Sequence, residues 1–447
     1  MFVHIQPGTW LALVRRRGPR WLQVGLSLVA VCTICLFLLP RASIPPSETY
    51  PFGLHDVTAG LVFNFFGWEI EALLSKIGSG LIAPEDTLAR EQRADVAQNY
   101  IDALGKAAQL RSQITAIYSQ AGGEIAREKA APEEQALAED RAWLDAHQDL
   151  VEGIFEEQVT MMLQEEGFGA WGFVWPPVKI RFTPLPLLLV TSDRAEITRA
   201  GDVHLEVDLS IPDRADLETK VDDRFPDKRS LVTPIGGLSA YPAMILETDS
   251  LVWLADTFAH EWTHHHLAFH PLGLRYSTST DMTSINETTA SIVGREVGRL
   301  VIQTYYPGLS GKLPALPTPP VKPPMSSKEV PPPEPPPPGV WDYDREMYQT
   351  RVHVDELLGE HKVEEAEAYM EQRREVFVEH GHNIRKLNQA YFAFYGSYAT
   401  SPSVVNPIGG QLDWLRAREG SLRAFVRVVS SIRSDADLLS LLRSQQG

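Results

Sequence analysis

The segment that most restricts the fold is residues 250–267, SLVWLADTFAHEWTHHHL, which contains neither glycine nor proline and carries apolar residues at helical spacing. This pattern predicts a helix. Residues four apart project from one face of a helix, a single turn from each other. His260 and His264 should therefore lie side by side, with Glu261 next to them. These side chains are either a set of metal ligands or a solvated face rich in histidine.

A second constraint is the apolar run of residues 21–40, which carries no charge from residue 24 to residue 39. With its flanks, the run is long enough to cross a hydrocarbon core of about 30 Å. Four arginines precede the run and one follows it closely. The positive-inside rule therefore predicts a cytoplasmic tail at residues 1–20, a single-pass transmembrane anchor at residues 21–40 and a body outside the cytoplasm. A cleaved signal peptide is the alternative, although no A-x-A site follows the run.

The composition of the body restricts which metal ligands and which partners it can have. Both cysteines of the chain lie inside the apolar run, so the body forms no disulfide and offers no thiolate ligand. Any metal site there must use His, Asp or Glu. The net charge of −17 argues against nucleic acid as a partner, because the phosphates would be repelled.

Changes of composition divide the body into four parts. Residues 41–170 are mainly helical, and two long runs within residues 85–166 flank a Gly-Gly break, which predicts an antiparallel helical pair. The strongly apolar helix expected at residues 61–78 belongs to the core or rests on a membrane. Residues 171–312 begin with β-rich runs, from residue 173 to about residue 247, that predict one small mixed sheet. The fold class is therefore α+β and mostly helical.

The third part, residues 313–339, is rich in proline. Proline does not fit the interior of a helix or sheet and favours extended polyproline geometry. We interpret the segment as an exposed insertion or linker, with a docking site for a proline-binding module as the alternative. The fourth part, residues 340–447, is helical. One helix is expected from residue 343 to about residue 394, and another at residues 412–432.

His260, Glu261 and His264 match the H-E-x-x-H pattern. In this pattern two neutral imidazoles hold Zn²⁺, and the carboxylate takes a proton from the metal-bound water. A zinc site needs a third protein ligand as well. The helix expected at residues 283–298 supplies Glu287 after a loop that turns the chain back. Glu296, about two and a half turns further along that helix, is the competing candidate.

The pentad HEWTH, followed by NETTASIVG at residues 286–294, resembles the gluzincin class of zinc metallopeptidases. More closely, the chain resembles a bacterial family described as predicted aminopeptidases. That family carries a later N-N-A-x-L…G-x-Y segment, which NQAYFAFYGSY at residues 388–398 matches in part. Gln389 replaces the second asparagine, and the likeness covers about residues 236–399. The matching positions are Asn388, Ala390, Gly396 and Tyr398.

The resemblance implies a zincin-like metallopeptidase domain at residues 171–312, with an active site that residues 340–447 complete. It also implies one zinc ion per chain. The expected zinc ligands are His260, His264 and Glu287.

The resemblance also assigns helpers to the reaction. Glu261 is expected to be the general base, and Tyr398 the donor that stabilises the developing oxyanion. Tyr391 and Tyr395 are the alternatives for the second role. Gluzincins often carry an aspartate four residues after the glutamate ligand, where this chain has Ser291, and Asp256 is a candidate substitute. The additional histidines are interpreted as surface or supporting groups: His265, His266 and His270.

The sequence thus predicts a membrane-anchored zinc peptidase that acts on a peptide or protein. The glycine-containing segment at residues 234–245 is a candidate edge strand for pairing with a peptide main chain, or a plain hairpin. Exopeptidase and endopeptidase activity both remain open, because no carboxylate motif for a substrate amine is evident. The alternative is a catalytically inactive zincin-like surface protein that acts through its proline-rich segment.

Overall fold

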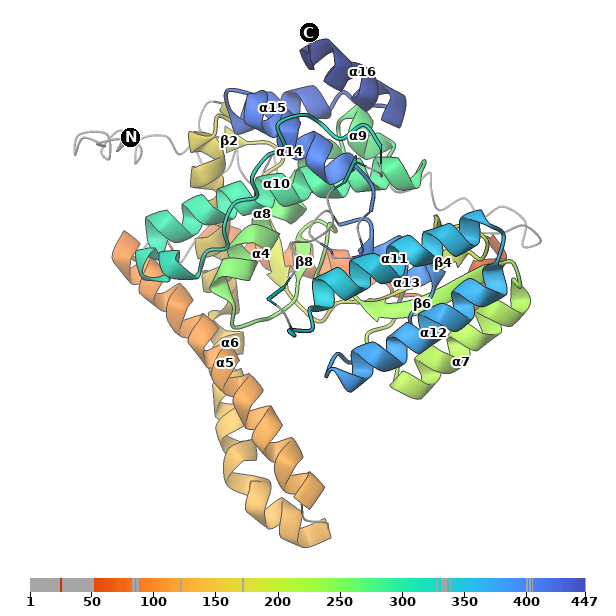
Figure 1. Cartoon of the computed structure of the whole chain (residues 1–447). Coiled ribbons are helices and arrows are strands. Elements are labelled where there is room, and N and C mark those ends of the chain that lie inside the picture. Colours follow the sequence, from red (N-terminus) through yellow and green to blue (C-terminus); the bar gives the residue numbers. More distant parts are fainter. Residues whose placement is uncertain are drawn as a thin grey trace.

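A computed structural model describes Gly25 and residues 52–446, with gaps at residues 83–84, 86–87, 121–122, 171–172, 327–328, 331–335, 338, 399–400, 402 and 404. The protein is mostly helical with small sheets, and so belongs to the α+β class (Figure 1). Apart from Gly25, the expected cytoplasmic tail and transmembrane anchor lie outside the described residues. Among the helices that are described, none is long and apolar enough to cross a membrane.

The predicted helical pair is present as α5 (Arg90–Gln120) and α6 (Gly123–Glu165), which extend together away from the body (Figure 1). The C-terminal half of α6 is buried in the body, where Phe155 and Val159 join the main core. Two shorter helices precede the pair, α3 (Phe52–Val57) and α4 (Phe65–Ile82).

Among the side chains of α4 that the structure describes, Ala72 and Lys76 are buried and others are exposed, so the expectation of a core helix there is correct only in part. Lys76 lies against α6 and forms ion pairs with Glu152 and Glu156, at 2.7 and 2.8 Å. On another face, Phe66 is 71% exposed and Ile70 is 44% exposed.

The β-rich region contains the predicted small mixed sheet, but it also forms another three-stranded sheet, which is antiparallel, and a hairpin of two two-residue strands. The first sheet is antiparallel, in the order β5-β4-β6, and the second is mixed, in the order β3-β8-β7. The strands of the first sheet are β4 (Leu187–Asp193), β5 (Arg199–Leu205) and β6 (Lys228–Pro234). Those of the second are β3 (Ile180–Phe182), β7 (Gly237–Leu238) and β8 (Ala243–Ile245), and the hairpin joins β1 (Gly169–Ala170) to β2 (Phe173–Val174).

Helices cover both faces of the antiparallel sheet. Alternate residues of a strand point to opposite faces, so neighbouring residues of β4 contact different helices. Leu187 and Leu189 of β4 share a core cluster with α7 (Ile211–Arg224). Leu188 shares another with Phe394 of α13 (Gln389–Tyr395).

Helix α7 was not predicted from the sequence, although its N-terminus carries a recognisable signal. Ser210 and Asp213 form a capping box there, in which each side chain accepts a hydrogen bond from the backbone N–H of the other residue. The helix is mainly polar, and only a few of its residues are buried, so the hydrophobic pattern was weak.

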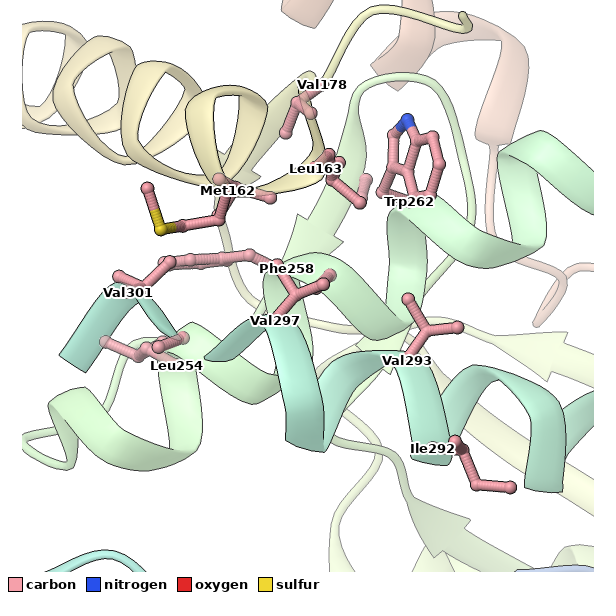
Figure 2. Close-up of a cluster of buried hydrophobic side chains, with 14 of the residues drawn as sticks. Met162, Leu163, Val178, Leu254, Phe258, Trp262, Ile292, Val293, Val297 and Val301 are labelled. Atoms are coloured by element: carbon pink, nitrogen blue, oxygen red, sulfur yellow. The ribbon is translucent and has the colours of Figure 1, made fainter. Parts of the chain in front are cut away.

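The main core lies where α6 meets α8 (Leu251–Leu267) and α10 (Thr280–Tyr305) (Figure 2). Phe258 of α8 lies between Met162 of α6 and Val297 of α10 in this view. The approach of α8 to α10 is close, because a Cβ added at Gly294 would lie 2.4 Å from Asp256 Oδ1. Two short elements flank α10, namely α9 (Pro271–Leu274) and η4 (Pro307–Lys312).

The C-terminal part is more broken than predicted. Two sequence stretches expected as single helices are divided. Residues 360–362 and 380–388 interrupt the first, and Gly420 with the helix-capping Ser421 interrupts the second. The helices are α11 (Tyr343–Gly359), α12 (Val363–Glu379), α14 (Ile408–Arg418), α15 (Leu422–Val429) and α16 (Asp435–Gln446).

The described beginning of the proline-rich segment is largely exposed, as expected, but part of it also contacts a helix. Its carbonyl groups accept hydrogen bonds from helix side chains: Gln411 Nε2 donates to Pro324 O at 2.8 Å, and Trp414 Nε1 donates to Val321 O at 3.3 Å. Proline leaves its own and its neighbours' carbonyl oxygens available as acceptors. This stretch therefore lies extended along α14.

Candidate metal centre

The three residues expected as zinc ligands converge. His260 Nε2 lies 3.1 Å from His264 Nε2, and Glu287 Oε2 lies 3.4 Å from the first nitrogen and 3.6 Å from the second. Helix α8 presents the two imidazoles one turn apart, and α10 presents the carboxylate across the close helix contact. The group is mostly shielded from solvent, and its donor atoms can hold a metal ion.

An amide orients the second imidazole. His264 Nδ1 lies 2.8 Å from Asn286 Oδ1, which can only accept, so Nδ1 is the nitrogen that keeps its proton when the ring is neutral, and Nε2 is then the one whose lone pair faces His260 and Glu287. Asn286 Nδ2 in turn donates to Leu272 O at 3.4 Å. Burial disfavours the charged form of His264, but the adjoining Glu287 carboxylate outweighs this and raises the pKa of His264 to about 9.

Tyr276 holds the other oxygen of the Glu287 carboxylate, and sequence reasoning missed it. Its hydroxyl donates to Glu287 Oε1 at 2.5 Å, which leaves Oε2 directed at the imidazoles. Burial alone would raise the pKa of Glu287, but His264 and His260 lower it well below its usual range. Burial together with the charge of Glu287 raises the pKa of the Tyr276 phenol. No motif marks Tyr276, because it lies in the irregular segment between α9 and α10.

Glu261 lies on the same helix and is held by the second sheet. Its Oε2 accepts a hydrogen bond from the hydroxyl of Ser239, in the loop after β7. Gly237 of β7 leaves the space that this carboxylate fills, since a Cβ added there would lie 2.3 Å from Glu261 Oε1. The edge strand β7 thus passes directly over the carboxylate.

Tyr398 lies close enough to the site to interact electrostatically with Glu287 and Glu261. Burial is the main reason that the pKa of its phenol is raised, and Glu287 adds to the effect. Arg199 of β5 faces the same group of residues. Its guanidinium interacts with the phenols of Tyr276 and Tyr398 and with Glu287, and it binds the carboxylate of Asp202.

The two alternative tyrosines are engaged elsewhere. Tyr395 and Thr233 of β6 share a hydrogen bond of 3.0 Å between their hydroxyls, and the Tyr391 hydroxyl lies 3.2 Å from that of Tyr343. Glu296, the competitor for the third ligand position, forms a bidentate ion pair with Arg416 at 2.9 and 2.8 Å. Glu287 is therefore the carboxylate of α10 that lies at the histidine pair.

Asp256, the candidate substitute for the aspartate that Ser291 replaces, lies near His260. Burial raises the pKa of Asp256, against the opposing effects of His260 and Arg295. Among the described residues, neither Asp256 nor Ser291 makes a side-chain hydrogen bond to His260 or His264. The group that orients His264 is Asn286, the residue before Glu287.

The additional histidines point away from the ligand group, as expected, but His265 is not a surface residue. It is buried, and its Nε2 bonds with Ala240 O at 2.6 Å, next to the serine that contacts Glu261. Burial lowers the pKa of His265 to about 4, which keeps the ring neutral. His266 stacks on Trp262 with centroids 5.1 Å apart and meets His270 edge-on at 4.8 Å.

Comparison with known proteins gives no relative from which function can be transferred: no family model matches the chain, and no curated protein or solved structure matches it significantly.

Proposed function

We propose that the protein is a zinc-dependent peptidase with a zincin-like fold, held at a membrane by residues 21–40 with its body outside the cytoplasm. The observation that carries this proposal is the convergence of His260, His264 and Glu287, with the Glu261 carboxylate on the same helix. A metal with two imidazole ligands and one carboxylate ligand, beside an independent carboxylate base, is an arrangement suited to hydrolysis.

The donor set fits zinc. Bonds of about 2.0–2.2 Å at tetrahedral angles separate neighbouring ligand atoms by roughly 3.3–3.6 Å. The three separations between donor atoms are 3.1, 3.4 and 3.6 Å. Three protein ligands also leave the fourth position open for water or substrate, as in catalytic rather than structural zinc sites. When bound, zinc supplies Lewis acidity and lowers the pKa of a coordinated water to about 7.

Glu261 is proposed to accept the proton of the attacking water and to deliver it to the leaving amine. Its Oε2 is held by Ser239, so the other oxygen, which lies at Gly237, remains available for the water proton. Tyr398 is proposed to donate its phenol proton in a hydrogen bond to the carbonyl oxygen as negative charge develops there. Its raised pKa keeps this phenol protonated, and therefore a donor, at neutral pH.

The second sheet is proposed to bind the substrate main chain along β7. One edge of that sheet is already occupied, because the N–H groups of Ile180 and Phe182 on β3 donate to Glu156 and Glu152, at 3.1 and 2.8 Å. The other edge strand, β7, lies over the proposed base. An extended peptide that paired with β7 would bring a carbonyl to the site through main-chain hydrogen bonds.

Metal removal tests the proposal. The body from residue 45, treated with a chelator and dialysed, should cleave no peptide of a mixed-sequence library. Addition of one equivalent of zinc should restore cleavage, read by mass spectrometry of the products. The same treatment of a His260→Ala, His264→Ala variant is the control for contaminating peptidases. Peptide cleavage by the zinc-free body, or equal cleavage by the double variant, would rule the proposal out.

A further inference from the structure

Two large apolar side chains are exposed beside the strand that covers the proposed base. Trp253, in the first turn of α8, is 38% exposed, and Leu246, just after β8, is 42% exposed. Both lie at Gly236. A Cβ added at Gly236 would meet the Trp253 ring at 2.9 Å, and Leu246 N donates to Gly236 O at 3.4 Å.

This apolar patch is continuous with the site. Gly236 borders Trp253 and the next residue, Gly237, borders Glu261. The ring edge is 2.9 Å from a Cβ added at Gly236, and the Glu261 carboxylate is 2.3 Å from one added at Gly237. Because successive Cα atoms are about 3.8 Å apart and each added Cα–Cβ bond is about 1.5 Å long, the two groups lie within roughly 12 Å of each other. The same relation appears along α8, where Trp253 precedes His260 by seven residues, or about two turns, and so lies on the same face.

We infer that Trp253 and Leu246 form an apolar subsite for a substrate side chain, and that the substrate is an extended peptide and not a single amino-acid amide. An extended chain advances about 3.3 Å per residue. A peptide that follows β7 therefore places the side chain of its second or third residue from the cleaved bond against Trp253. The inference rests on the proposed function, since it names the substrate that the proposed site takes.

Glycine at two successive positions supports this assignment: Gly236 lies just before β7, and Gly237 is its first residue. A side chain at Gly236 would displace the Trp253 ring, and one at Gly237 would displace the proposed base. At these two positions the chain therefore has no side chain that would separate a bound peptide from Trp253 and Glu261. A partly exposed indole beside these glycines can cover a leucine-sized side chain of the substrate. Burial of part of that side chain strengthens binding by about a factor of ten in affinity.

A moving-leucine series tests the inference. The probes are blocked decapeptides of alanine with serine for solubility, in which a single leucine occupies each position in turn. The zinc-loaded body from residue 45 should cleave them two or three residues from the leucine, and the cleaved bond should move as the leucine moves. In Trp253→Ala, cleavage should become independent of the leucine position. Trp143→Ala serves as a matched control, because Trp143 has a similar exposure of 37% but stacks on His147 of α6 and does not border Gly236 or Gly237.

Binding separates this inference from the proposed function. In zinc-loaded Glu261→Gln, which keeps the ligand residues, the leucine peptides should bind about tenfold more tightly than the leucine-free peptide, and adding Trp253→Ala should remove that difference. If this holds while the wild type cleaves nothing, the subsite stands and the peptidase proposal fails. If the wild type cleaves peptides but neither the cleaved bond nor the affinity follows the leucine, the subsite is wrong. Absence of any peptide binding would overturn the subsite as well.

Discussion

Each ligand residue of the proposed zinc site that has a supporting hydrogen bond makes it with a neutral group, through an atom other than the proposed ligand atom. Asn286 fixes the ring of His264, and Tyr276 fixes the carboxylate of Glu287. Neutral partners set the direction of a ligand without adding a further charge to the buried centre. Supporting groups of this kind typically alter metal affinity by 10- to 100-fold.

Removal of the Tyr276 hydroxyl should weaken zinc binding. Tyr276→Phe keeps the ring but leaves Glu287 Oε1 without its donor, so the carboxylate loses its fixed direction. We expect the zinc dissociation constant to rise about tenfold, measured by competition with a chromophoric chelator. Tyr391→Phe is the matched control, since its hydroxyl contacts Tyr343 instead of the site. An unchanged affinity in Tyr276→Phe would show that the hydrogen bond has no part in metal binding.

Tyr398→Phe should reduce turnover and leave binding intact. A donor that acts on the oxyanion stabilises the transition state more than the bound substrate. The loss of one such donor lowers kcat by about 10²–10³, while KM and zinc content should change little. Steady-state kinetics on one cleaved peptide measures the effect. Tyr395→Phe is the control, and a larger loss in that variant would transfer the role from Tyr398 to Tyr395.

The residues found from sequence were those whose spacing on a helix carries the chemistry. His260, Glu261 and His264 lie within five residues, and Glu287 is recognisable as an acid on the following helix. Tyr276, Ser239 and Arg199 were not recognisable, because each reaches the site through tertiary packing from a loop or strand. The sequence around each of these residues contains no motif with the spacing of metal ligands or of a catalytic base.

At the scale of elements, the site depends on how closely α8 and α10 approach. Glu287 reaches the imidazoles because Gly294 and Gly298 of α10 leave room for the backbone and side chain of Asp256 on α8. A Cβ at Gly298 would lie 2.7 Å from Asp256 N and 2.8 Å from its Cα. These glycines therefore set the separation of the two ligand-bearing helices.

Gly294→Ala should both destabilise the protein and weaken zinc binding. The added methyl group would overlap Asp256 Oδ1, and overpacking of a core typically costs about 1–3 kcal/mol, more than the roughly 1 kcal/mol that alanine gains in a helix. Urea unfolding and chelator competition measure the two effects. Gly308→Ala, where a Cβ meets nothing within 4 Å, is the control. Equal stability of the two variants would mean that α8 and α10 can separate without loss.

Helices were predicted correctly where a long run of residues keeps a helical hydrophobic pattern. They were missed or wrongly joined where a capping residue or a glycine sets the boundary of the helix. The helical pair α5 and α6 follows from its periodicity and its Gly-Gly break. The polar helix α7 was missed because its start is marked by the capping box of Ser210 and not by apolar spacing. The helix expected at residues 412–432 is divided because Ser421 begins a new helix after Gly420.

At the scale of the whole molecule, the proposal places the site in a body attached to a membrane by the N-terminal apolar run. The described chain begins again at Phe52, near the end of that run, and the exposed Phe66 and Ile70 of α4 lie a short distance further along. The acidic body and the basic N-terminal flank are consistent with opposite sides of one membrane.

The predicted topology can be measured with sealed right-side-out vesicles that carry the full chain. Protease added outside should degrade the body while an epitope at the N-terminus stays intact, because four arginines retain that end inside. The matched control exchanges the four arginines for serine and should lose the uniform orientation. Protection of the body until detergent is added would reverse the assigned topology.

The central claim is that a carboxylate acts beside a bound zinc ion to hydrolyse peptides. The rate of peptide cleavage by zinc-loaded Glu261→Gln, compared with zinc-loaded wild type, tests it most directly. We predict one zinc ion per chain in both proteins and a cleavage rate at least about 10²-fold lower in the variant, because general base catalysis is lost while the ligands remain. Equal rates at equal zinc content would contradict the account.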